Sequence, residues 1–205
     1  MSNPERLRDY VMAMTELVNE VGSDEAQLFR RGEPLLAQLV SADDWLPGTC
    51  AEASPDSYRQ YLLWCDPLER FSVVSFVWGP GQKTPIHDHT VWGMVGMLRG
   101  RERSEEYERP EPGRAMRKTG EHHTHPGEVD KVSPSIGDIH LVANDIHDDA
   151  SISIHVYGAN IGSVRRHRFD ESDGRATPFV SGYSSGVTPN LWDRSAEVRA
   201  RWGSR

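Results

Sequence analysis

The segment 84–90 carries two histidines separated by one residue, His87 and His89. In an extended chain, side chains at positions i and i+2 point to the same face. The two imidazoles therefore converge if this segment is a strand, and imidazole is a common ligand of transition metals. A third histidine, His140, follows about fifty residues later within the segment 137–144. We predict that the fold brings His87, His89 and His140 together as a metal site.

A second chemical pattern lies in the segment 151–157, where polar and apolar residues alternate. In a strand, Ser153, His155 and Tyr157 share one face, and isoleucine and valine occupy the other. An ordinary solvated strand face shows the same alternation. The functional interpretation is a hydrogen-bond relay that points into a barrel and brings the Tyr157 hydroxyl near the metal.

The composition limits the class of protein. The chain has 205 residues and a net charge of −8, so a nucleic-acid partner is not expected, and an anionic substrate needs a local basic group. Two cysteines, Cys50 and Cys65, form no disulfide framework, which favours a reducing, cytoplasmic compartment. The first residues are charged, and no stretch approaches the ~20 apolar residues of a membrane span, so neither a signal peptide nor a membrane segment is expected.

The elements that must position these residues follow from periodicity. Apolar residues at helical spacing predict a helix over 4–22, ended by Gly22 and followed by a cap at Ser23 or Asp24, and a second helical region that restarts at Pro34. From about residue 58 the period becomes two, which is typical of a β-sandwich or barrel. Strands are expected at 58–65, 71–78, 84–90, 91–99, 101–108, 128–132, 138–143, 151–157, 164–169 and 178–183.

We therefore expect one domain over 1–205, with a helical part at 1–50, a β-barrel at 58–183 and a tail at 184–205. The tail segment 190–193 is expected to pack across the barrel, and the charged last residues are expected to fray. The segment Glu121–His125 is rich in potential ligands, but glycine and proline flank it. That setting favours a surface loop over a second metal site.

The two histidine segments belong to longer patterns. They read Gly81-x5-His87-x-His89-x3-Gly93-x6-Gly100 and Pro134-x2-Gly137-x2-His140-x3-Asn144. These patterns resemble the two motifs of the cupins, which implies a double-stranded β-helix, or jelly-roll, barrel. The cupin motif has a glutamate, the usual fourth ligand, where this chain has Gly93. The site is thus expected to offer three neutral imidazoles and no protein anion. The charge of a bound dication then stays uncompensated and several coordination positions stay open, so an anionic ligand such as a thiolate can bind the metal directly. Imidazole also suits zinc, copper and nickel, so ligand type alone does not select the metal.

Taken together, the three histidines and the Ser153-x-His155-x-Tyr157 pattern resemble the thiol dioxygenases of the cysteine dioxygenase family. The resemblance implies Fe(II) on the three histidines and oxidation of a small thiol by dioxygen to its sulfinic acid, with both oxygen atoms ending on sulfur. The expected partners are therefore the thiol and dioxygen, and no further redox cofactor is needed. Whether the protein is a monomer or a homo-oligomer is left open by the sequence.

Two departures separate the chain from the mammalian type of this family. That type has a cysteine after the second histidine, cross-linked to the active-site tyrosine, whereas residues 90–100 contain no cysteine. It also has a carboxylate-binding arginine where alignment on Tyr58 places Gln60, although Arg59 is adjacent and a slip of one residue would exchange them. The chain is most similar to the bacterial 3-mercaptopropionate dioxygenases, which show this glutamine and take their arginine from a later strand, here Arg166.

Arg165 and Arg168 compete with Arg166 for the carboxylate, and a solvated edge strand would explain the same basic cluster. An arginine suits this role because its planar fork binds a carboxylate through two hydrogen bonds. The favoured substrate is 3-mercaptopropionate. The alternatives are L-cysteine, then mercaptosuccinate, then a different cupin enzyme or a non-catalytic cupin that binds metal.

Overall fold

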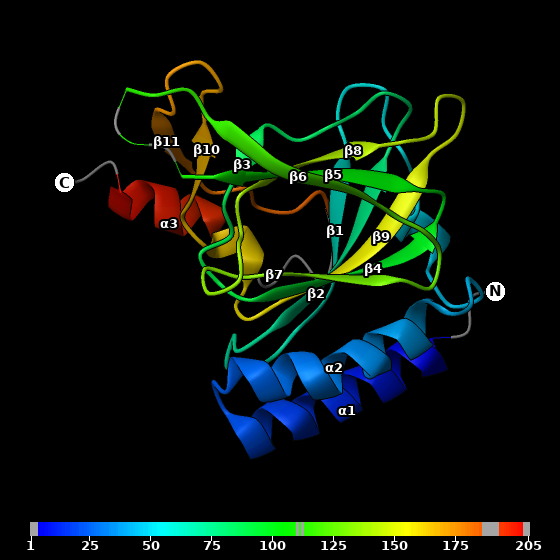
Figure 1. Ribbon diagram of the computed structural model, residues 1–205. Coiled ribbons are helices and arrows are strands. Elements are labelled where there is room, and N and C mark those ends of the chain that lie inside the picture. Colours follow the sequence, from blue (N-terminus) through cyan, green and yellow to red (C-terminus); the bar gives the residue numbers. More distant parts are fainter. Residues whose placement is uncertain (1–3, 110, 112, 186–192, 203–205) are drawn as a thin grey trace.

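Two helices lie side by side along one face of the β-structure, α1 (Glu5–Val21) and α2 (Glu25–Val40) (Figure 1). The computed structural model describes residues 4–109, 111, 113–185 and 193–202. The predicted apolar stripe of α1 is buried, for example at Met14 and Leu17. Gly22 ends this helix at φ 58°, in the left-handed region that glycine tolerates, and its N–H donates to Val18 O. The Asp24 side chain then accepts from the Gln27 N–H and caps α2.

Helix α2 runs without interruption through Pro34, so the predicted restart at this proline is wrong. Proline lacks one N–H and disfavours a helix interior, but a helix is also held by the packing of its apolar face. Leu36, Leu39 and Val40, which follow the proline, are all buried. Tertiary packing on the sheet below thus outweighs the local cost.

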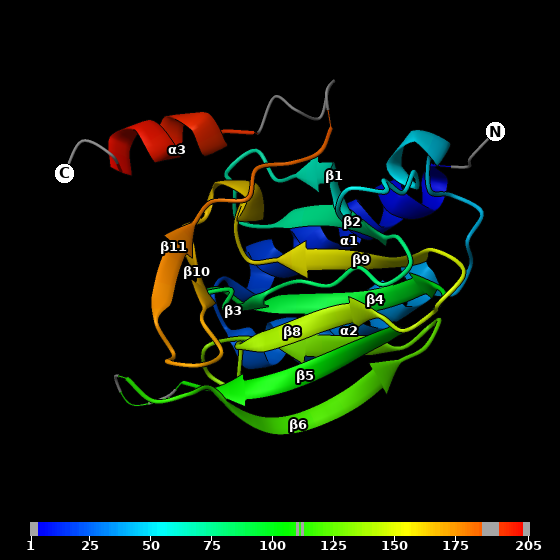
Figure 2. The same ribbon diagram turned by 90° about the horizontal axis from the view of Figure 1, so that it is seen from above.

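The strands form two antiparallel sheets that face each other, seen from above in Figure 2. The five-stranded sheet has the order β1-β2-β9-β4-β7, and the six-stranded sheet has the order β11-β10-β3-β8-β5-β6. The remaining bounds are η1 (Gly48–Cys50), β1 (Arg59–Cys65), β2 (Ser72–Trp78), β3 (Ile86–His87), β4 (Gly93–Arg99), β5 (Glu102–Glu108), β6 (Arg117–Thr124), β7 (Val129–Val132), β8 (His140–Asn144), β9 (Ser151–Tyr157), η2 (Ile161–Ser163), β10 (Arg166–Phe169), β11 (Ala176–Phe179) and α3 (Ser195–Trp202). The predicted mainly-β double-stranded β-helix with N-terminal helices is confirmed.

Strand β9 separates the two compartments of the core. Ile152, Ile154 and Val156 pack with the two helices in one buried cluster, whereas Tyr157 belongs to a second cluster inside the barrel. The helices approach closely enough that a Cβ at Gly96 would lie 2.9 Å from atoms of α2. The helical pair therefore fixes the outer face of the sheet whose inner face carries Ser153, His155 and Tyr157.

Strand β6 is the clearest error of the sequence prediction. The segment 121–125 was expected to be a surface loop, but Glu121–Thr124 form the end of β6, which pairs with β5. Its residues are mostly polar and exposed at the edge of a sheet, so no apolar alternation marks the strand. The predicted strand at 84–90 is also shorter, because only Ile86–His87 is a strand and His89 follows its end.

The C-terminal part adds a helix that was not predicted. Helix α3 lies at the side of the barrel that carries β10 and β11 (Figures 1 and 2). It is attached by Arg199, which donates to Val180 O at 2.7 Å, and by Arg165, whose guanidinium lies over the Trp202 ring. The expected packing of 190–193 falls mostly outside the described residues, since only Asp193 among them is described. No helix in the described part of the chain has the length and apolar character needed to cross a membrane.

Candidate metal centre and substrate pocket

Three histidines meet at the inner face of the six-stranded sheet. His87 lies in β3, His89 follows the end of this strand, and His140 begins β8. His87 pairs directly with His140 across β3 and β8. One ring nitrogen from each of His87, His89 and His140 lies within 4.8 Å of the others, and all three side chains are buried. In the described part of the chain, no other group of three or more His, Cys, Asp or Glu side chains has this spacing.

Hydrogen bonds from the ring nitrogens orient His87 and His89. His87 Nδ1 lies 3.0 Å from Pro85 O, and His89 Nδ1 lies 3.0 Å from Asp138 O. A carbonyl oxygen only accepts, so these Nδ1 atoms carry the proton and leave each Nε2 with a free lone pair. The His89 Nε2 atom is buried with no hydrogen-bond partner. A buried unpaired acceptor of this kind is what a bound metal ion would satisfy.

Burial keeps the three imidazoles neutral. It lowers the pKa of His87 and of His89 well below the ordinary histidine value, and it lowers the pKa of His140 to about 4. The neighbouring histidines add repulsion between charged forms at His87 and His89. Neutral imidazole is the form that binds a metal, so the donor set fits a divalent transition metal near neutral pH.

Two aspartates that the sequence analysis missed hold the histidine segment in place. The Asp138 carboxylate accepts from the backbone N–H groups of His89 and Thr90, and Thr90 has φ 62°, an uncommon value for a β-branched residue. Asp88 is 1% exposed and accepts from the backbone N–H of His167 on β10. In the sequence, these aspartates are marked only by their position close to the candidate histidines. That position does not predict the hydrogen bonds that they accept.

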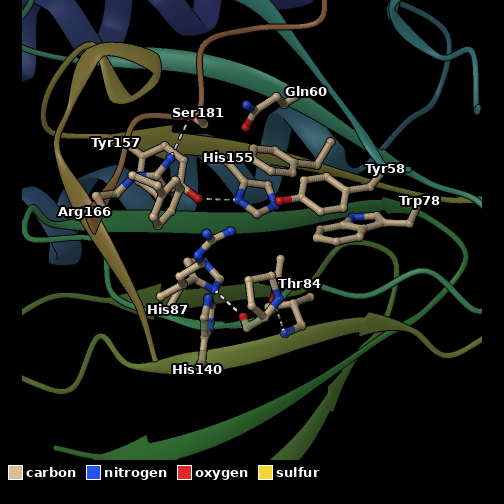
Figure 3. A pocket seen from close by; sticks show the side chains of 15 residues that line it. Tyr58, Gln60, Trp78, Thr84, His87, His140, His155, Tyr157, Arg166 and Ser181 are labelled. Atoms are coloured by element: carbon tan, nitrogen blue, oxygen red, sulfur yellow. Dashed lines mark hydrogen bonds between the residues drawn. The ribbon is translucent and has the colours of Figure 1, made fainter. Parts of the chain in front are cut away.

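The Ser153, His155 and Tyr157 side chains form a continuous hydrogen-bonded chain on the inner face of β9, hereafter the relay. Ser153 Oγ lies 2.8 Å from His155 Nε2, and His155 Nδ1 lies 2.7 Å from the Tyr157 hydroxyl (Figure 3). The Phe76 ring stacks on His155 at 4.1 Å between centroids, and the Tyr157 ring stacks on His89 at 5.5 Å. Burial raises the pKa of Tyr157 and lowers that of His155, so both are neutral near pH 7.

Gly93 stands where the cupin motif has its glutamate, and the structure gives a steric reason. A Cβ at this position would lie 2.8 Å and 2.9 Å from two ring carbons of Tyr157 and 3.0 Å from Val132. Contacts this short require one of the groups to move. The Tyr157 ring therefore fills the space from which a side chain at position 93 would start.

A cavity of about 210 Å³ opens beside the histidines and the relay. Figure 3 shows the Arg166 side chain, which comes from β10, among the residues that line it. Arg166 is 4% exposed, donates to Ser181 Oγ at 2.8 Å, and stacks on Phe179 at 4.8 Å. Its Nε has no hydrogen-bond partner, and no carboxylate among the described residues lies within ion-pair distance of it. The cavity thus holds a buried cation that forms no direct ion pair with a described carboxylate, although Asp88 acts on it at longer range.

The competing residues are placed differently. Gln60 lines the cavity, where its amide donates to Gly182 O at 2.7 Å, whereas Arg59 donates to Ser54 Oγ and does not line the cavity. Arg168 lines the cavity but is exposed, and the Arg165 guanidinium lies over a ring of α3. Ser181, which holds Arg166, was missed because it contacts the site from a segment beyond the last strand.

The barrel and the three convergent histidines define a cupin with a candidate metal site. Residues 55–172 match the family model described as cysteine dioxygenase type I, which is more than half of the chain. The chain therefore belongs to the cysteine dioxygenase type I family, as the motifs suggested. The family implies a dioxygenase that acts on a small molecule, and the matched region includes the three histidines, the relay and Arg166.

Several solved structures are similar to part of the chain. The TT1209 protein from Thermus thermophilus is 17% identical with a TM-score of 0.43, over 55% of this chain and 92% of that chain. A Klebsiella pneumoniae protein with a double-stranded β-helix domain is 14% identical with a TM-score of 0.44, over 65% and 87%. A Cupin 2 conserved barrel domain protein from Salinispora arenicola is 19% identical with a TM-score of 0.40, over 55% and 83%.

Proposed function

We propose that the protein is an Fe(II)-dependent thiol dioxygenase that converts 3-mercaptopropionate and dioxygen to the sulfinic acid. The observation that carries the proposal is Arg166, a buried guanidinium that forms no direct ion pair with a described carboxylate and lies in the same small cavity as the three-histidine site. Burying an unpaired charge is costly, so a substrate anion is the expected partner. A bidentate carboxylate would also satisfy the free Nε atom.

The metal supplies one part of the chemistry. Iron on His87, His89 and His140 would bind the thiol sulfur as thiolate and activate dioxygen. The overall reaction transfers four electrons from sulfur to dioxygen, places both oxygen atoms on sulfur and releases the thiol proton. No other redox cofactor is required by this balance.

The protein side chains bind and orient the substrate. Arg166 holds the carboxylate at a fixed distance from the histidines, so the length of the carbon chain decides whether sulfur reaches the metal site. The Tyr157 hydroxyl, held by the relay, provides a polar group in the wall of the cavity (Figure 3). Phe76 and Trp78 exclude water from the same wall.

The charge of the cavity supports 3-mercaptopropionate over L-cysteine. The described residues that line it include Arg166 and Arg168 but no aspartate or glutamate. Cysteine would bring an ammonium group into this cationic cavity with no carboxylate to pair it. 3-Mercaptopropionate has the thiol and the carboxylate without the ammonium. The two free cysteines, Cys50 and Cys65, agree with the cytoplasmic location that we propose.

The proposal is tested by oxygen uptake of the iron-loaded protein with 3-mercaptopropionate, L-cysteine, mercaptosuccinate and cysteamine. We expect the highest kcat/KM for 3-mercaptopropionate, and a sulfinate product that gains two labelled atoms from ¹⁸O₂ in mass spectrometry. A higher kcat/KM for cysteine would reject the substrate, and the absence of uptake with all four thiols would reject thiol dioxygenation. Loading with zinc instead of iron is the matched control, because zinc has no redox chemistry.

A further inference from the structure

The strand that carries Arg166 lies near the edge of its sheet. Arg166 is the first residue of β10 and pairs with Phe179 on β11, the edge strand. On the other side, the ladder between β10 and β3 includes Arg168 and Phe169 and does not extend to Arg166. An isolated two-stranded ribbon is only marginally stable in water. The end of this ribbon that carries Arg166 therefore needs support from another part of the chain.

Helix α3 lies beside this ribbon (Figures 1 and 2). Arg165, the residue before β10, is exposed, and its guanidinium lies 4.5 Å from the centroid of the Trp202 ring. A cation placed over an indole ring is attracted to it electrostatically. The next residue, Arg166, is buried and lines the cavity. Trp202 therefore holds the chain at the position directly before the arginine that we propose to bind the carboxylate.

The same helix holds the segment that accepts the hydrogen bond of Arg166. Ser181 Oγ accepts from Arg166 Nη2 at 2.8 Å (Figure 3), and Val180 directly precedes Ser181 in the chain. The Val180 carbonyl oxygen accepts from Arg199 Nη2 on α3 at 2.7 Å. A hydrogen bond from a charged donor is stronger than one between neutral groups. One helix thus contacts the residue before each partner of the Arg166–Ser181 hydrogen bond.

Gly182 shows how closely α3 packs against this segment. It has φ 71°, and a Cβ there would lie 2.9 Å from the Oγ atom of Ser195, the first residue of α3. A residue with a side chain at this position would force the helix or the segment to move. The Gly182 carbonyl oxygen also accepts from the Gln60 amide at 2.7 Å. The segment 180–182 therefore supports two residues that line the cavity, Gln60 and Arg166, and is itself packed against α3.

An arginine that is held in place before the substrate arrives binds a carboxylate at a lower entropic cost. The Ser181 hydroxyl and the Phe179 ring, 4.8 Å from the guanidinium carbon, fix the Arg166 side chain in this way. An arginine that is not held loses rotamer freedom when it binds, which corresponds to roughly two- to twelvefold in affinity. Contacts that keep β10 and the segment 180–182 together therefore contribute to the affinity for the carboxylate.

We propose that Trp202 and Arg199 are positioning residues that order the Arg166 guanidinium for the carboxylate of the thiol substrate. Neither of them touches the cavity, because no residue of α3, all of which the structure describes, is among those that line it. They act through Arg165 and Val180, the two residues that they contact. This inference rests on the proposed role of Arg166. Its consequence is that α3 raises the affinity for the carboxylate and does not affect the binding of sulfur to the metal.

Isothermal titration calorimetry of the zinc-loaded protein tests this role, because zinc binds thiolates and has no redox chemistry. The ligands are 3-mercaptopropionate, which has a carboxylate, and 2-mercaptoethanol, which has none. Trp202→Ala and Arg199→Ala are each expected to raise the dissociation constant of 3-mercaptopropionate by roughly two- to twelvefold, and to leave that of 2-mercaptoethanol unchanged. The two variants remove different contacts, so one suffices if the other fails to fold.

Two variants of the same helix serve as controls. Arg201→Ala removes a side chain that pairs with Glu197 within α3, and it should keep both parent dissociation constants. Trp202→Phe retains an aromatic ring for the Arg165 guanidinium and should recover most of the affinity lost in Trp202→Ala. Zinc content and melting temperature are measured on the same preparations. An equal rise in the dissociation constants of both thiols would indicate a general disturbance of the metal site and would overturn the proposal.

The parent protein and Arg166→Ala separate this inference from the proposed function. Arg166→Ala should lose the preference of the parent for 3-mercaptopropionate over 2-mercaptoethanol. A parent protein that binds both thiols equally overturns the role of Arg166, and the inference fails with it. A parent that prefers 3-mercaptopropionate, together with Trp202→Ala and Arg199→Ala variants that keep the same ratio of dissociation constants, overturns the inference alone.

Discussion

Replacing Arg166 by alanine is the perturbation that most directly tests the substrate side of the cavity. Arg166 is 4% exposed, and its free Nε leaves room for a second hydrogen bond to a carboxylate. Truncating one partner of a buried, hydrogen-bonded charge pair costs about 2–5 kcal/mol. At about 1.4 kcal/mol per tenfold change, KM for 3-mercaptopropionate should rise by roughly thirtyfold to a few thousandfold.

The structure also indicates that the neighbouring residues can replace Arg166 only in part. Arg168 lines the same cavity but is exposed, so solvent screens its charge and it replaces Arg166 only in part. Gln60 already donates to Gly182 O and offers no charge. The loss should therefore exceed that of an ordinary surface ion pair. Arg166→Lys should recover only part of it, because lysine keeps the charge and loses the planar fork.

The assay is steady-state oxygen uptake, with metal content and melting temperature measured on the same preparations. Cysteamine, which has no carboxylate, should be a poor substrate for the parent and should change little in Arg166→Ala. Arg59→Ala is the matched control, since its guanidinium donates to Ser54 Oγ away from the cavity. A large KM effect in Arg59→Ala with a small one in Arg166→Ala would refute the assignment and favour a cysteine-binding site.

Three further predictions concern the metal, the tyrosine and the carboxyl group of Glu102, which is 3% exposed. His140→Ala should lose the metal in elemental analysis after gel filtration, whereas His122→Ala on β6 should retain it; stoichiometric metal in His140→Ala would remove this residue from the ligand set. The intact mass should equal that of the unmodified sequence, because both cysteines are free, and a loss of two hydrogens mapped to Tyr157 would contradict the cavity described above. For Glu102, a pKa raised from 4.5 to about 8 means that the folded state holds a proton the unfolded state releases, so the contribution of this group to stability is greatest below pH 4.5 and is lost as the pH rises through 8. Glu102→Gln removes this loss and should be more stable than the parent at pH 9 by at most about 5 kcal/mol. Urea unfolding of the parent and of Glu102→Gln at pH 5 and pH 9 measures this difference. An equal pH dependence of the unfolding free energy in the two proteins would contradict the raised pKa of Glu102.

The β-barrel and the three candidate ligands could be predicted because their signals are local. Residues two apart on an extended segment share a face, and this rule alone grouped His87 with His89 and Ser153 with Tyr157. The rule led to the right grouping even though His89 lies past the end of β3. The apolar face of α1 was equally readable, because helical spacing is a property of consecutive residues.

The errors of the sequence prediction arose where tertiary contacts determine the local structure. Strand β6 is held by its ladder with β5 and has almost no apolar residues, so periodicity could not identify it. Helix α2 passes through Pro34 because buried packing compensates a local defect. Ser181 reaches the site from a distant part of the chain and has no sequence pattern that distinguishes it from an ordinary surface residue.

The close approach of Gly93 to the Tyr157 ring constrains how such a site can change during evolution. A single substitution that supplies the fourth, anionic ligand at position 93 would place its Cβ 2.8–2.9 Å from the aromatic ring. The ring would have to be lost first, and the intermediate protein would have neither the anionic ligand nor the phenol. The four-ligand cupin centre and the tyrosine-bearing centre are therefore separated by a paired replacement, and a combinatorial library over positions 93 and 157 should yield metal-binding variants that carry one feature or the other, but not both.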